Sequence, residues 1–208
     1  MGKSVVIIGK GPSVLNSTAD FISTFDEVAI CNFPPMEGYE NYIGTKADFH
    51  FFNAHDPNPY SKEVLNNLGL KYILNTHKVP HNGYRSSYPD HDFSYSPDYG
   101  QKTVKEIEEG YGFDPSTGTQ AFYYFVKNEE YSTICLVGFD FFKVGEKAYY
   151  YPPSEVQPSL KYLYSDTQRA AFDVNGIRIK ENLHNSKKSE SFVYDMVKKY
   201  NKNLRIIK

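Results

Sequence analysis

The stretch Ser4-Val5-Val6-Ile7-Ile8-Gly9-Lys10-Gly11-Pro12-Ser13 decides how this chain folds. Residues 4–8 are a short, β-branched and continuous apolar run, which is typical of a strand covered on both faces. Gly9 and Gly11 permit a tight turn with close backbone approach, and Pro12 suits the first position of a helix. Strand, glycine turn and helix start therefore follow one another, which is half of a Rossmann-type unit.

Similar apolar runs predict five further strands, at 27–32, 48–53, 71–75, 133–137 and 204–207. Two helices are indicated by helical spacing of apolar residues: one begins after Ser116-Thr117 and the other carries the stripe from Phe192 to Tyr200. Weaker helices are expected after Pro12 and at 61–67 and 104–109. Strands alternating with helices predict an α/β fold: a single Rossmann-like domain over 1–208, with a mostly parallel sheet flanked by helices.

Two stretches resist assignment to a helix or a strand. Residues 76–100 are rich in His, Pro, Asp, Ser and Tyr, and we expect a long loop there. Residues 143–182 include Tyr149, Tyr150 and Tyr151 and are expected to form a lid-like excursion. Long loops inside a compact domain are usually functional lids or disordered excursions.

The charge balance argues against a polyanion as partner. Lys and Arg total 23 and Asp and Glu total 25 among the 208 residues, for a net charge of −2, so we expect no nucleic-acid partner. Residues 179–208 carry +5, which would suit an anionic acceptor or peripheral contact with an acidic membrane, although such lysines are more often the solvated face of a helix. The sequence is compatible with a homo-oligomer and with a monomer.

Aromatic residues and cysteines add two expectations. The 19 Tyr and 15 Phe raise the aromatic share to 16%, which favours a polar cleft sized for a sugar or base, or else reflects a general bias. Cys31 and Cys135 lie in strand-like runs and are expected to be reduced core residues, as in a cytoplasmic protein. No signal sequence or membrane-spanning segment is expected.

Several polar residues follow the predicted strands, where ligands bind in open α/β sheets. They are Gly9 to Ser13 after the first strand, Asn32 at the end of the second, Asn53 at the end of the third, and Ser116, Thr117 and Gly118 at a helix start that could receive a phosphate. Together they predict a nucleotide site, although each alone is also ordinary turn or capping chemistry. Val14 replaces the third glycine of the dinucleotide fingerprint, and a Walker A motif is missing from this turn.

Six motifs in order, IIGKGPS (7–13), CN (31–32), FFN (51–53), STG (116–118), VGFDFF (137–142) and HNSK (184–187), resemble those of the bacterial CMP-sialic-acid sialyltransferases. These enzymes form carbohydrate-active glycosyltransferase family 42, which is related to family 29. The resemblance extends from about Lys3 to Lys199.

The resemblance implies a role for each matching residue. Gly9, Gly11, Pro12 and Ser13 would form the loop under the donor nucleotide, Asn32 and Asn53 would bind its ribose, cytosine or phosphate, and Ser116, Thr117 and Gly118 would hold it at a helix start. His184 would take the proton from the acceptor hydroxyl. A Tyr pair in the lid would stabilise the departing CMP phosphate. The implied reaction inverts the anomeric centre and uses no metal or cofactor, with a CMP-activated sugar as donor and a glycan or glycolipid as acceptor.

Two positions depart from the family pattern. Lys10 stands where Asn is usual, which changes the charge near the donor. Phe142 stands where the first lid Tyr is expected and cannot donate a hydrogen bond, and Tyr149, Tyr150 or Tyr151 would serve as the second lid Tyr. Loss of one donor to a leaving phosphate costs on the order of 10²-fold in rate by analogy with an oxyanion hole.

Other readings remain open. Asp90-His91-Asp92 matches the D-x-D pattern of metal-dependent glycosyltransferases, but a turn with solvated acidic residues is the better interpretation. His77 and His81 have i, i+4 spacing, but Pro80 between them argues against a helix that would bring them together. We therefore assign no metal site. A metal-dependent nucleotide or pterin pyrophosphate-transferring enzyme would use the same glycine turn, and only Asp140 is well placed as its strand-end acid. A nucleotide-binding module that has lost turnover is the non-enzymatic alternative.

Overall fold

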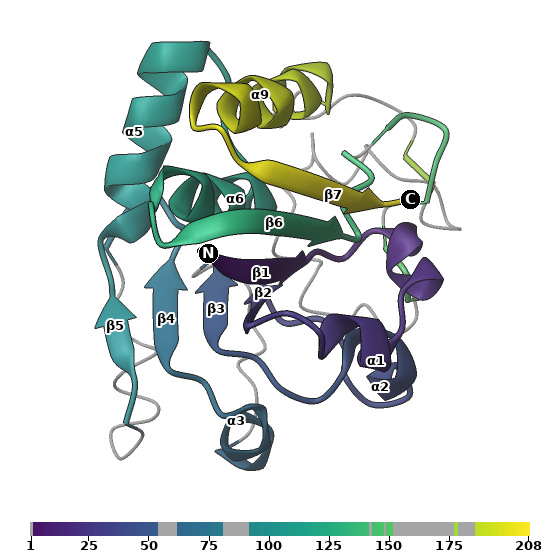
Figure 1. The fold of residues 1–208 in the computed structure, drawn as a ribbon. Coiled ribbons are helices and arrows are strands. Elements are labelled where there is room, and N and C mark those ends of the chain that lie inside the picture. The colour runs from purple at the N-terminus through teal and green to yellow at the C-terminus, as the bar shows by residue number, and fades with distance from the viewer. Residues whose placement is uncertain are drawn as a thin grey trace.

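The computed structural model describes residues 2–53, 62–80, 92–141, 143–147, 149–151, 177–178 and 186–208. Within these ranges the centre of the molecule is a seven-stranded sheet in the order β5-β4-β3-β2-β1-β6-β7, and every neighbouring pair is parallel (Figure 1). The strands are β1 (Lys3–Ile8), β2 (Glu27–Cys31), β3 (Phe49–Phe52), β4 (Tyr72–Asn75), β5 (Ser94–Ser96), β6 (Tyr131–Val137) and β7 (Asn203–Ile207). The predicted α/β class is confirmed.

Helices cover both faces of the sheet. On one face lie α5 (Tyr99–Tyr111), α6 (Thr117–Lys127) and α9 (Ser186–Lys199), which share one hydrophobic cluster with the strands. The other face is covered by the short 3-10 helix η1 (Pro12–Asn16) with α1 (Ala19–Ile22), α2 (Glu40–Ile43) and α3 (Lys62–Leu68). The strand order reverses between β1 and β6, so the switch point lies where these two strands end.

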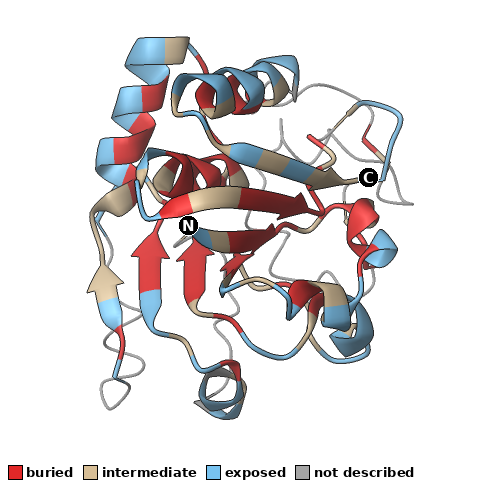
Figure 2. Cartoon of the chain, in the orientation of Figure 1, coloured by how far each residue is buried: buried red, intermediate tan, exposed pale blue. Residues whose placement is uncertain are grey.

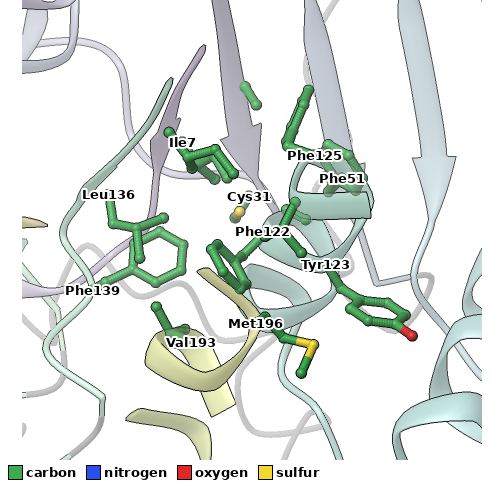
Figure 3. Close-up of a cluster of buried hydrophobic side chains, with 14 of the residues drawn as sticks. Ile7, Cys31, Phe51, Phe122, Tyr123, Phe125, Leu136, Phe139, Val193 and Met196 are labelled. Atoms are coloured by element: carbon green, nitrogen blue, oxygen red, sulfur yellow. The ribbon is translucent and has the colours of Figure 1, made fainter. Parts of the chain in front are cut away.

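Alternation along each strand builds the two cores, because successive side chains point to opposite faces. Ile7 of β1 belongs to the same hydrophobic cluster as Phe122 and Phe125 of α6 and Met196 of α9 (Figure 3). Its neighbour Ile8 belongs to the second cluster on the opposite face. The central strands are consequently buried on both sides, whereas the outer faces of α5 and α9 are exposed (Figure 2).

All six predicted strands and the helices expected after Ser116 and along 192–200 are confirmed. The segment 76–100 is not one continuous loop: it contains β5, and α5 begins within it at Tyr99. The sequence signal was weak because β5 has only three residues and takes its order from pairing with β4. Residues 81–91 lie outside the described residues.

Two short parts of the 143–182 excursion meet beside the sheet. The amide of Gly145 donates to the carbonyl of Arg178 (2.7 Å), and the amide of Arg178 donates to the carbonyl of Glu146 (3.0 Å). Lys147 and Ile177 form an isolated antiparallel bridge.

Two further expectations concern the core and the length of helices. Cys31 and Cys135 are free thiols buried in the core, as predicted. Among the described helices, none is both long and apolar enough to span a membrane.

Candidate functional site

The glycine loop lies at the switch point, pressed against the loop that follows β6. Gly9 N donates to Val137 O (2.8 Å) and Gly11 N donates to Gly138 O (3.0 Å). A Cβ at Gly9 would lie 2.5 Å from Gly138 O, and a Cβ at Gly11 would overlap the Asp140 carboxylate. Both glycines are therefore required for the close approach of the two loops.

Asp140 ties the start of η1 to this loop. Its Oδ2 accepts from both the amide and the hydroxyl of Ser13, each at 3.0 Å. Ser13 is only 6% exposed, so its two donors serve the protein rather than a ligand. The structure thus places Ser13, which was predicted to form part of the loop under the donor nucleotide, as a buried support of that loop.

Asn32, at the end of β2, is held by hydrogen bonds from two other elements. Its Oδ1 accepts from the amide of Asn53, at the end of β3 (2.9 Å), and from the hydroxyl of Thr117, at the start of α6 (3.3 Å). Three residues predicted for the nucleotide site therefore come together. Because Oδ1 is the acceptor, the amide orientation is set, and Nδ2 donates to no group within the described ranges.

Only part of the first turn of α6 is capped by a side chain. Ser116 is the N-cap residue, and its hydroxyl oxygen accepts from the amide of Thr119 (3.2 Å). In the part of the chain that the structure describes, the amides of Thr117 and Gly118 have no protein acceptor. Open amides at the positive end of a helix dipole suit an anion. Gly118 has no side chain because a Cβ would press on the ring of Phe139, at 3.0 Å.

Thr76 and Gln120 belong to the same group of residues and were missed by sequence reasoning. The hydroxyl of Thr76, directly after β4, lies 3.1 Å from the Thr117 hydroxyl, and Gln120 Nε2 donates to Thr76 O (3.0 Å). Thr76 obeys the rule that found Asn32 and Asn53, a polar residue just after an apolar strand. Gln120 left no sequence signal, because its position in the helix does not reveal its hydrogen bond to Thr76 O.

The tyrosine cluster of 149–151 contacts the glycine loop. The amide of Tyr150 donates to Lys10 O (3.0 Å), and Lys10 Nζ lies 4.9 Å from the centroid of the Tyr149 ring. The ring of Tyr149 stacks on that of Tyr151, with centroids 5.2 Å apart. These contacts hold residues 149–151 against the glycine loop, which is one part of the predicted nucleotide site.

Tyr150 and Tyr149 differ in their surroundings. Tyr150 is 7% exposed, packs edge-on against Tyr39, and donates its hydroxyl to Pro35 O at 2.8 Å. Tyr149 is half-buried beside the Lys10 ammonium. Of the two predicted catalytic tyrosines, Tyr149 therefore has the position better suited to a ligand, and Tyr150 anchors the segment to the core.

Two buried titratable groups lie next to the site. His50 of β3 is fully buried and its Nε2 lies 2.6 Å from Asn32 O; burial lowers the pKa of its imidazole to about 4. Burial raises the pKa of the Cys31 thiol to about 12, so it stays protonated and is not a nucleophile at neutral pH.

Several predicted residues lie outside the described residues. They are His184, Phe142, Asp90, His91 and His81, so the role of His184 stays a prediction. Asp92 is exposed, and within the described ranges no three His, Cys, Asp or Glu side chains are grouped as metal ligands.

The basic C-terminal segment has partners within the fold. Lys202 Nζ donates to Asn128 O (2.9 Å) and to Tyr131 O (2.5 Å), and Lys188 Nζ donates to Gly112 O (2.8 Å). Lys187, Lys198 and Lys199 are exposed on α9. Part of the positive charge therefore anchors backbone carbonyls, and part forms a solvated helix face.

The fold matches solved sialyltransferase structures. CstII from Campylobacter jejuni, in complex with the substrate analogue CMP-3FNeuAc, has a TM-score of 0.67 and 19% identity, over 99% of this chain and 81% of that chain. An apo alpha-2,3-sialyltransferase from the same organism has a TM-score of 0.59 and 16% identity, over 99% and 75%. The structural class is therefore that of the sialyltransferase fold.

A mammalian enzyme has the same fold. A mammalian sialyltransferase in complex with Gal-beta-1-3GalNAc-ortho-nitrophenol has a TM-score of 0.56 and 16% identity, over 99% of this chain and 69% of that chain. No protein-family model and no curated protein sequence matches the chain. At these identities the likeness establishes the fold, and the activity has to be argued from the site.

Proposed function

We propose that this chain is a glycosyltransferase that moves a sialic-acid-type sugar from a CMP-activated donor to a hydroxyl of a glycan. The observation that carries the proposal is the set of donors at the carboxyl edge of the sheet: Asn32 is hydrogen-bonded to Thr117 at the open first turn of α6, and Lys10 lies in the loop that follows β1. A nucleoside monophosphate offers this edge both hydrogen-bond acceptors and negative charge. The choice of cytidine is supported by CstII structures with bound CMP or a CMP-sugar analogue.

The proposed reaction places each charge beside a group that stabilises it. The acceptor oxygen bonds to the anomeric carbon, the bond from that carbon to the phosphate oxygen breaks, and CMP leaves with the electron pair. Its charge develops near Lys10 and the α6 amides, which act as fixed electrostatic stabilisers. We propose inversion without a metal, and His184 as the base that takes the acceptor proton, because an ordinary imidazole pKa of about 6.5 suits that step.

The test has two stages. Calorimetric titration with CMP and UMP measures nucleotide binding, and release of CMP from CMP-sialic acid, with and without a galactose-terminated disaccharide, measures turnover. Asn32→Asp replaces the amide donor by a charged acceptor and should weaken CMP binding more than tenfold. Asn41→Asp is the matched control, because Asn41 is exposed on α2.

The possible results separate the candidate functions. Release of CMP that the disaccharide accelerates supports the transferase. Tight CMP binding without release favours the nucleotide-binding module, an outcome that Phe142 in place of a lid Tyr makes worth testing. No CMP binding, with pyrophosphate transfer that needs Mg²⁺, overturns the proposal in favour of the pyrophosphate-transferring enzyme.

A further inference from the structure

One row of side chains crosses the whole sheet on the face covered by η1, α1, α2 and α3. His50 is the one histidine in this row. Strand register places these residues side by side: Tyr95, Ile73, His50, Ile30, Ile8, Val137 and Ile207. His50 is fully buried between Ile73 and Ile30. A buried imidazole costs free energy that an aliphatic side chain there would not, unless its N–H groups are hydrogen-bonded. A histidine at this position in an otherwise largely aliphatic row therefore needs a physical explanation.

The contact of His50 with the end of β2 supplies that reason. Its Nε2 lies 2.6 Å from Asn32 O. A carbonyl oxygen only accepts, so Nε2 carries the proton and the imidazole is the donor. The ring also packs edge-on against Phe33, with centroids 4.8 Å apart. His50 thus contacts both residues at which the chain leaves the sheet.

Asn32 has a backbone conformation that needs support. Its φ is +59°, in the left-handed region that few residues other than glycine adopt, with Asn among the more tolerant. The Asn32 amide donates to Phe51 O (2.6 Å), and the side-chain Oδ1 accepts from Asn53 and Thr117. With His50 on the carbonyl, both backbone polar groups and the side-chain acceptor are engaged. The Nδ2 donor is then presented in one orientation.

We propose that His50 is a positioning residue, which locks the Asn32 turn so that the Asn32 side chain offers a preorganised N–H donor to the ligand. The inference rests on the proposed function, in which Asn32 contacts the donor nucleotide. It assigns His50 to the nucleotide site although His50 is buried beneath that edge of the sheet. Preorganisation of this kind lowers the cost of binding, because the donor is already in place.

A change of His50 to Leu separates positioning from packing. Leucine continues the apolar row, so His50→Leu should keep the thermal midpoint of the wild type or raise it, and should weaken CMP binding about tenfold. His50→Gln can still donate toward the carbonyl and should bind CMP within threefold of wild type. Ile73→Leu, a volume-conserving change next to His50 in the same row, is the control and should leave CMP binding unchanged.

A double-mutant cycle tests whether His50 acts through Asn32. Asn32→Gly removes the amide and tolerates positive φ, so adding His50→Leu to it should weaken CMP binding less than twofold further. If His50→Leu alone binds CMP within twofold of wild type, or if the two losses multiply, the positioning role is wrong. If His50→Leu does not fold, the cycle is run with His50→Phe.

Failure of the proposed function gives a different result. If wild type binds no CMP, the proposed function falls, and the role of His50 is read instead from crystal structures of wild type and His50→Leu. A shift of Asn32 out of the left-handed region in His50→Leu supports the positioning role. An unchanged Asn32 φ and an unchanged side-chain amide overturn it.

Discussion

The ammonium of Lys10 lies 4.9 Å from the centroid of the Tyr149 ring, and the backbone carbonyl of Lys10 accepts a hydrogen bond from the amide of Tyr150. The pair joins the glycine loop at the end of β1 to the start of the 143–182 excursion. A cation over an aromatic face contributes about 0.5–2 kcal/mol, depending on its exposure to water. The contact therefore holds a positive charge at the sheet edge where we place the donor phosphate.

Removal of that charge should weaken nucleotide binding. Lys10→Met keeps much of the chain length and loses the ammonium, so CMP affinity should fall about tenfold at low ionic strength, and less in 0.5 M salt, because salt screens the wild-type attraction. Lys10→Arg should retain most of the affinity. Calorimetric titration at two salt concentrations checks this, and equal affinity of Lys10→Met and wild type at both would exclude an electrostatic role.

The two neighbouring tyrosines should respond differently to loss of the hydroxyl. Tyr149→Phe keeps the ring on Lys10 and should slow turnover about tenfold or more with little change in stability. Tyr150→Phe loses the hydrogen bond to Pro35 O and should cost about 1 kcal/mol of unfolding free energy, with turnover nearly unchanged. Steady-state rates and urea unfolding on both variants decide the assignment, and a reversed pattern would make Tyr150 the catalytic residue.

Gly11 should tolerate no side chain. Gly11→Ala forces a Cβ into the Asp140 carboxylate that holds Ser13, so we expect a loss of about 2 kcal/mol or more in unfolding free energy. Gly110→Ala is the matched control in α5, where an added Cβ meets no atom within 4 Å, and it should stabilise by about 0.5 kcal/mol through helix propensity. Chemical denaturation measures both, and a stable Gly11→Ala would contradict the close approach of the two loops.

His50 should make stability depend on pH below neutrality. Burial lowers its pKa in the folded state to about 4, while the unfolded chain has the ordinary value of about 6.5. The unfolded state therefore binds more protons between these values, and stability falls as the pH drops from 6.5 toward 4, at up to about 1.4 kcal/mol per pH unit. Above pH 6.5 this group has no effect. In His50→Leu the thermal midpoint should fall less over the same range, and parallel curves for the two proteins would contradict a neutral buried imidazole.

His184 should be needed for chemistry and not for nucleotide binding. His184→Ala should lower transfer at least 100-fold while CMP affinity stays within threefold of wild type. In the wild type the rate should rise with pH, because a general base acts in its unprotonated form. Rates across pH 5.5–8.5, with CMP titration as the control, test the role, and transfer by the variant within tenfold of wild type removes it.

The fold followed from local signals to a large extent. Six strands were predicted because each is a short segment rich in apolar residues, and α6 because Ser116 precedes a helical stripe of apolar residues that contains Phe122 and Phe125. β5 was missed because three residues at a sheet edge carry no periodicity of their own. The start of α5 was missed because Tyr99, which is partly buried, is held there by a tertiary contact in which its hydroxyl donates to Gln120 O.

The sequence predicted which residues belong to the candidate site but not the hydrogen bonds between them. Asn32, Asn53 and Thr117 were proposed as separate strand-end and helix-start residues, and the structure joins them by hydrogen bonds. The engagement of Ser13 by Asp140 and of Tyr150 by Pro35 could not be predicted, since each bond links residues more than 100 positions apart. Such contacts depend on how the loops pack and leave no local pattern.

The sequence by itself determined the α/β architecture and the edge of the sheet where polar residues gather. Local hydrophobic runs and glycine turns suffice for this, because the carboxyl ends of parallel strands meet at one edge. Only the tertiary structure decided which of those residues retain a donor for a ligand and which are used by the protein. That distinction depends on hydrogen bonds between segments that are distant in the sequence. Asn32 uses its side-chain oxygen within the protein and keeps its Nδ2 donor, whereas the donors of Ser13 are both used by Asp140.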